Sequence, residues 1–135
     1  MRLLSFHNDK AVKEKYVNRV KAHAKADELI HGKYWENGKG CAVGCTVHSG
    51  DHLAYEKELG LPEWLARLED AIFEGLSNGD AKTFAVDFLL AIPIGKNLEL
   101  VKWKFCAFIL KENIERVLLL KIKYDLKQKV VEAIQ

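Results

Sequence analysis

Residues 62–76 read PEWLARLEDAIFEGL, and this stretch carries the clearest fold signal in the chain. Pro62 suits the first position of a helix, where its missing N–H is not needed. The apolar residues that follow recur three or four positions apart, which is the spacing of one helix face. They are Trp64, Leu65, Leu68, Ile72 and Leu76. The stretch therefore predicts an amphipathic helix packed on a core.

Helical signals continue on both sides of this stretch. We expect further helices over about residues 10–30, 51–59, 80–91, 97–111 and 112–134, most of them next to an Asn, Asp, Ser or Gly residue typical of a helix end. Alternation with a period of two is confined to residues 117–124, where helix formers on both sides favour a helix. The predicted fold is all-α, a single compact domain of five or six helices over residues 1–135.

Composition narrows the class of protein. The chain has 135 residues, of which 49% are hydrophobic and 30% charged, so one domain can bury a core without a disulfide or a metal. It has no apolar run of transmembrane length, no signal-peptide pattern and an odd number of cysteines. We therefore expect a cytoplasmic protein without a membrane partner.

Charge is unevenly distributed along the chain. Residues 51–80 hold two bases and eight acids, whereas residues 96–135 hold nine bases and five acids. The segregation is interpreted either as complementarity between packed helices or as a surface that steers a protein partner or a second copy. The lysines near the C-terminus spread around the predicted helix instead of forming one stripe, so we expect no nucleic-acid partner.

The residues suited to metal binding or nucleophilic chemistry cluster in one region. Six of the eight His and Cys residues lie within residues 23–52, namely His23, His31, Cys41, Cys45, His48 and His52. The cluster includes a glycine-rich segment, residues 31–50, which we expect to be a loop between the first and second helices. Small residues at positions 38, 40, 42 and 44 would let the backbone approach another backbone or a ligand closely.

The first helix supplies part of this candidate site. If it reaches residue 30, His23 and Asp27 lie on the stripe that faces the core, and their spacing suits an imidazole–carboxylate pair. A divalent metal would then take His23, Asp27, His48 and His52 as ligands, with Glu56 nearby, and would activate a water for hydrolysis. The spacing Cys-x3-Cys departs from that of structural zinc sites, so carboxylate and His ligands are favoured over Cys ligands.

Cysteine chemistry is a further interpretation of the same residues. Cys41 follows Lys39 at a possible helix start, where its pKa would fall, and His23 and Asp27 are the other catalytic candidates. The residues expected to bind a ligand are Trp35, Glu36, Lys39 and Cys45. The structural alternative makes Cys41 and Cys45 small buried hydrophobes, and uses Trp35 to hold the loop on the core. Cys106 is predicted to lie in the core.

The segment WENGKGCAVGC at residues 35–45, together with LARLED at residues 65–70, resembles a family of small uncharacterised bacterial and phage proteins. The resemblance extends over about residues 1–110. It implies a bacterial or phage origin and carries no activity.

Two hypotheses about function remain at this point. In the first, the cluster binds a divalent metal or a small ligand and catalyses a hydrolytic step. In the second, the chain is a non-enzymatic interaction or regulatory protein, and the cluster is a packed polar group that holds the loop.

Overall fold

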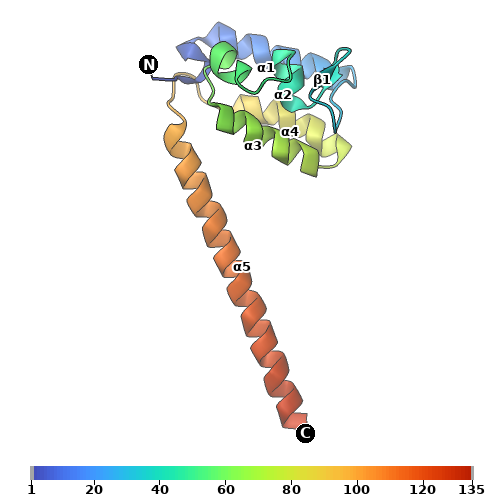
Figure 1. Cartoon of the computed structure of the whole chain (residues 1–135), viewed down its shortest axis with the longest axis vertical. Coiled ribbons are helices and arrows are strands. Elements are labelled where there is room, and N and C mark those ends of the chain that lie inside the picture. The colour runs from blue at the N-terminus through green and yellow to red at the C-terminus, as the bar shows by residue number, and fades with distance from the viewer. Residues whose placement is uncertain (1, 135) are drawn as a thin grey trace. The chain divides into compact units, whose positions relative to one another are not determined.

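The structure is a computed structural model and describes residues 2–134. It divides into two units at Glu99, the first comprising the residues up to Glu99 and the second those from Leu100 onward. The first unit is a compact helical body and the second is part of one long helix (Figure 1). The all-α fold class is confirmed, whereas the single domain over residues 1–135 stays a prediction.

The first unit is built from short and medium helices. Its elements are η1 (Ser5–Asn8), α1 (Lys10–Lys25), β1 (Trp35–Glu36), β2 (Lys39–Gly40), α2 (Ala42–Val47), η2 (Tyr55–Leu59), α3 (Glu63–Gly75) and α4 (Asn78–Ala91). α1 packs on α2 and α4, and α3 packs on the same two helices, so α2 lies at the centre (Figure 1). Every residue of α2 is buried.

The N-terminal turn closes the first unit. Residues 6–8 adopt a left-handed backbone, and Phe6 is fully buried. Ser5 forms hydrogen bonds to the turn after α4 through both its backbone and its side chain. Ser5 Oγ accepts from the Lys96 N–H at 2.9 Å, and the Ser5 N–H donates to the Lys96 carbonyl at 2.9 Å. The chain therefore enters and leaves this unit at the same place.

α1 ends earlier than its sequence pattern predicts. Asp9 caps its start by accepting a hydrogen bond from the Ala11 N–H, but the helix stops at Lys25 and not near residue 30. Asp27 follows with a positive φ of 59°, so it no longer shares a helical face with His23. The prediction that Asp27 faces the core is therefore wrong, whereas Tyr16 and Val20 of α1 are buried.

The glycine-rich segment is partly ordered secondary structure. β1 and β2 form a two-residue antiparallel hairpin in which Trp35 pairs with Gly40, and α2 begins two residues later. A Cβ at Gly40 or Gly44 would lie 2.0 or 1.6 Å from the Tyr34 carbonyl oxygen. Both positions must be glycine for the hairpin to lie against α2, which confirms the predicted close approach of backbone to backbone.

α3 buries a face that is rotated from the predicted one and shares Leu65 with it. Its buried residues are Leu65, Ala66, Glu69, Asp70 and Phe73. Trp64, Leu68 and Leu76 lie at the edge of the core and are only half-buried. This rotation brings the carboxyl groups of Glu69 and Asp70 into the interior.

The C-terminal region is one helix. α5 runs from Glu99 to Ile134, where the sequence suggested a break near residue 111, and none of its described residues is buried. The prediction that Cys106 lies in the core is therefore wrong, because Cys106 is exposed. Its neighbours Trp103 and Phe108 are also exposed, at 66% and 55% of their surfaces.

The contact between the hairpin and α2 can be tested at Gly44. We expect Gly44→Ala to lower the free energy of unfolding by about 2–3 kcal/mol or more, because the added methyl group overlaps a backbone carbonyl that cannot move without displacing the hairpin. Gly79→Ala is the matched control, since nothing lies within 4 Å of its Cβ position and α4 begins there. Alanine at residue 79 should leave stability unchanged or raise it by up to about 1 kcal/mol. Urea denaturation measures both, and equal effects would contradict the packing argument.

Candidate functional site

Two of the predicted site residues meet across α1 and α2. His23 Nδ1 donates to Glu28 Oε2 at 2.5 Å, and His23 Nε2 lies 2.8 Å from His48 Nε2. A hydrogen bond between two ring nitrogens needs one proton and one lone pair, so the two facing nitrogens share a single proton. The residues thus form a chain from Glu28 through His23 to His48.

Trp35 covers this chain from the hairpin. Its ring stacks on His48 with 4.5 Å between centroids and meets His23 edge-on at 5.6 Å. Burial, together with the charge of Arg19 and the neighbouring His23, lowers the pKa of His48. Trp35 was predicted either to bind a ligand or to hold the loop, and these contacts are those expected for holding the loop.

Glu28, and not the predicted Asp27, is the acid that pairs with His23. The Asp27 carboxylate is exposed and pairs with Lys82 on α4, so the predicted His23–Asp27 pair does not form. Lys82 also holds the pKa of Asp27 below its usual value. The cause is the early end of α1, which moves residues 26–31 off the helical spacing on which the prediction depended.

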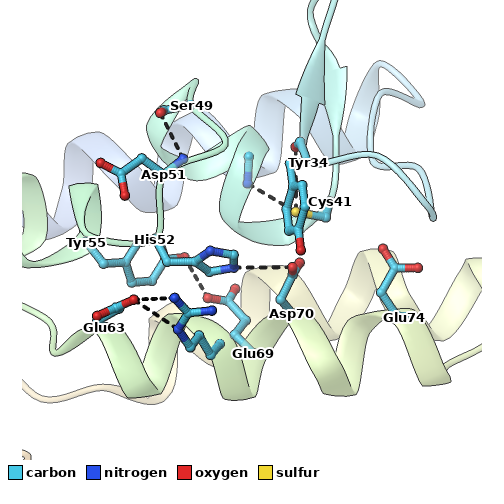
Figure 2. Close-up of polar contacts among 12 residues, drawn as sticks. Tyr34, Cys41, Ser49, Asp51, His52, Tyr55, Glu63, Glu69, Asp70 and Glu74 are labelled. Atoms are coloured by element: carbon cyan, nitrogen blue, oxygen red, sulfur yellow. Dashed lines mark hydrogen bonds and ion pairs between the residues drawn. The ribbon is translucent and has the colours of Figure 1, made fainter.

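A second polar cluster lies between α2, η2 and α3 (Figure 2). Tyr55 OH donates to Glu69 Oε2 at 2.6 Å, and both side chains are completely buried. Burial is the main cause that raises the pKa of Glu69 to about 8. The hydrogen bond from Tyr55 lowers this pKa, and the charge of the nearby Asp70 raises it. Glu69 Oε1 finds no hydrogen-bond partner among the described residues.

Asp70 connects this cluster to Cys41 and His52. Its Oδ2 lies 3.4 Å from His52 Nε2, while its Oδ1 is buried without a hydrogen-bond partner in the described part of the chain. Figure 2 shows Asp70 beside Cys41, beneath the Tyr34 ring. A shallow cleft of about 280 Å³ opens here, lined by Tyr34, His52, Arg67, Asp70, Ala71 and Glu74.

The two cysteines of the glycine-rich segment are unsuited to nucleophilic chemistry in this state. Cys41 is 1% exposed and Cys45 is fully buried. Burial and the Asp70 carboxylate raise the pKa of Cys41, and burial raises that of Cys45 to about 12. The Sγ of Cys41 accepts a hydrogen bond from the Gly44 N–H and thereby caps α2. Both thiols are protonated at neutral pH and serve packing.

The predicted metal ligands separate into three places. His23 and His48 face each other, whereas His52 pairs with Asp70 and Asp27 pairs with Lys82. Within residues 2–134, no group of three or more His, Cys, Asp or Glu side chains is arranged to hold a metal ion. The divalent metal stays a prediction, with two donors brought together by the fold.

The remaining predicted ligand-binding residues do not gather around one cavity. Glu36 is exposed and pairs with Lys33, and Lys39 is exposed on β2 directly opposite Glu36. Sequence reasoning missed Glu69 and Asp70, although both lie three or four residues from Ala66 and Phe73. That spacing was the available signal, because an acid on an apolar stripe must be paired or perturbed.

Comparison of the chain with protein-family models, with curated proteins and with solved structures gives no match. The resemblance of residues 35–45 and 65–70 to small bacterial and phage proteins therefore stays a prediction.

Across residues 2–134, no helix combines the length and the apolar character that crossing a membrane requires.

Thiol labelling distinguishes packed cysteines from a reactive one. In the native protein we expect one thiol per chain to react quickly with a maleimide, because only Cys106 is exposed among the three cysteines. Cys106→Ser should remove this fast reaction, and the other two thiols should react only on unfolding. Mass spectrometry after brief labelling gives the result. Fast labelling of Cys41 in the folded Cys106→Ser variant would restore the nucleophile hypothesis.

Glu69 makes stability depend on pH. Its folded pKa is raised, so the folded state holds a proton that the unfolded state releases between about pH 4.5 and 8. The contribution of Glu69 to stability is therefore complete below about pH 4.5 and is lost as pH rises towards 8, at up to about 1.4 kcal/mol per pH unit.

Glu69→Gln tests this dependence directly. The amide cannot ionise and can still accept from Tyr55, so the difference in unfolding free energy between variant and wild type should grow in favour of the variant from pH 5 to pH 8. Urea denaturation at several pH values measures the difference, and a constant offset would show that Glu69 does not titrate as described.

Proposed function

We propose that the chain is a non-enzymatic interaction protein and that α5 is its contact element. The observation that carries this proposal is the number of large apolar side chains that α5 exposes. They are Leu100, Val101, Trp103, Phe108, Ile109, Leu110, Ile114, Val117, Leu118, Leu119, Leu120, Ile122, Tyr124, Leu126, Val130, Val131 and Ile134.

A helix that exposes this many apolar side chains to water gains little stability from packing. Isolated helices are marginal because nucleation is costly, and most helical stability in proteins comes from packing an apolar face. Exposed apolar patches of this extent mark sites of interaction, and a surface of another protein is one partner that they fit. Burial of such side chains contributes about 25 cal/mol per Å² of apolar surface, which is the driving force for association.

The polar clusters of the first unit support a structural role for the residues that suggested chemistry. The Glu28–His23–His48 chain joins α1 to the end of α2, and Trp35 packs on it from the hairpin. Cys41 and Cys45 are buried and protonated at neutral pH. These contacts serve to hold the glycine-rich segment in place, as the second sequence hypothesis requires.

The hypothesis of a metal-dependent or small-ligand site has less support. His23 and His48 bring two imidazole nitrogens together, but a catalytic zinc site commonly uses three protein ligands. A bacterial or phage origin and a regulatory role belong to the proposal as well, on the strength of the sequence resemblance alone.

The test compares two double variants of α5. Leu110→Glu with Val117→Glu places charges on the exposed apolar surface, and Lys102→Glu with Arg116→Glu changes charge without removing apolar side chains. The tagged protein is isolated under mild conditions from cells that make it naturally, and its mass is measured by light scattering. We expect wild type and the Lys102/Arg116 variant to be part of an assembly, and the Leu110/Val117 variant to be a single chain.

One result would contradict the proposal. If wild type itself has the mass of one chain, α5 is not a contact between proteins. Circular dichroism of each variant confirms that the first unit remains folded and that the comparison concerns α5.

A further inference from the structure

One row of residues on α5 has the spacing of a coiled-coil seam. Starting at Leu100, the spacing alternates between three and four residues, which keeps a row facing a partner helix. The members are Leu100, Trp103, Ala107, Leu110, Ile114, Val117, Lys121, Tyr124, Gln128 and Val131, of which eight are apolar. None of them is buried. We call this row the seam.

A second apolar row lies on the opposite side of α5 but is interrupted. Phe105 and Phe108 begin it, Glu112 and Glu115 occupy its middle, and Leu119, Ile122 and Leu126 continue it. Two carboxylates in succession would have to be buried if a helix packed along its whole length, which is costly. The seam is therefore the better continuous contact.

The charges beside the seam specify an orientation. The flank formed by residues 104, 111, 118, 125 and 132 reads Lys, Lys, Leu, Asp, Glu, so it is basic in its first half and acidic in its second. An antiparallel partner presents the same flank in reverse order. Lys104 then faces Glu132 of the second copy, Lys111 faces Asp125 of the second copy, and Leu118 faces its own equivalent.

The seam itself agrees with this register. Ile114 lies against Tyr124 of the second copy, Leu110 against Gln128, and Val117 against Lys121, whose long apolar stem can cover a valine while its charge reaches water. On the flank at the other side of the seam, Leu120 lies against Leu120 of the second copy. The overlap covers residues 104–134, which is about 46 Å of helix.

A parallel pair is less favourable for a specific reason. It sets Lys121 directly against the Lys121 of the second copy inside the seam, where like charges repel with little water to screen them. It retains ion pairs only near the ends, between Glu99 and Lys104 and between Lys127 and Glu132. The antiparallel pair has four ion pairs by symmetry and no like-charge contact along either flank.

We infer that the partner of α5 is the α5 helix of a second copy of this chain, bound antiparallel along the seam. This inference rests on the proposed function, since it names the partner of the same contact element. It commits to self-association through the seam alone.

The decisive experiment reverses one pair of charges in the full-length protein. Lys111→Glu alone and Asp125→Lys alone each put like charges together twice across the dimer, so each should weaken association about tenfold in dissociation constant. The double variant restores opposite charges and should recover wild-type association. Glu112→Lys, which lies away from the seam, is the control and should change it little. Sedimentation equilibrium of the purified protein gives the constants.

Cross-linking tests the orientation separately. In a Cys106→Ser background, Leu118→Cys should form a disulfide between copies under mild oxidation, because residue 118 faces its own equivalent in the antiparallel pair. Ile114→Cys should not, because residue 114 would face its equivalent only in a parallel pair. Disulfide formation by Ile114→Cys in place of Leu118→Cys would overturn the antiparallel arrangement.

The mass of the purified wild type separates this inference from the proposed function. A dimer, or a tetramer of two pairs, with recovery in the double variant supports the inference. A monomer when pure that is part of a complex with another protein in cells overturns the inference and leaves the proposed function standing. A monomer in both settings overturns both.

Discussion

The packing of the first unit depends on one close approach, that of the Tyr34 carbonyl to the backbones of Gly40 and Gly44. No side chain fits at either glycine, so the hairpin lies directly on α2 and fixes Trp35 over the two histidines. Because α2 is buried on every side, the position of the hairpin also fixes where His48 and Cys41 stand. The stacking of Trp35 on His48 thus depends on backbone contact at two residues that carry no side chain.

Much of the fold was predictable because it depends on local signals. Pro62 marks the start of α3, and Asp9 caps α1 as its position suggested. The failures came at the ends of helices. α1 ends at Lys25 because the chain turns away at Asp27 with a positive φ, and α5 continues through residue 111 because nothing in the local sequence forces a break. Neither event leaves a sequence pattern.

Part of the membership of the candidate site was predictable, but its pairing was not. His23, Trp35 and His48 do come together, but Glu28 replaces Asp27, and Glu69 and Asp70 were overlooked. Clustering along a sequence shows which residues are near one another in the chain, whereas pairing depends on where helices end and which face they bury. Cys106 illustrates the same limit, since an apolar neighbourhood in the sequence does not place a residue in a core.

Ser5 lies beside the point where the chain leaves the first unit, because it hydrogen-bonds Lys96 and Gly95. The two ends of this unit are therefore close together in space. Domains whose ends are adjacent tolerate circular permutation and insertion into a loop of another protein. The first unit has the geometry that both rearrangements require.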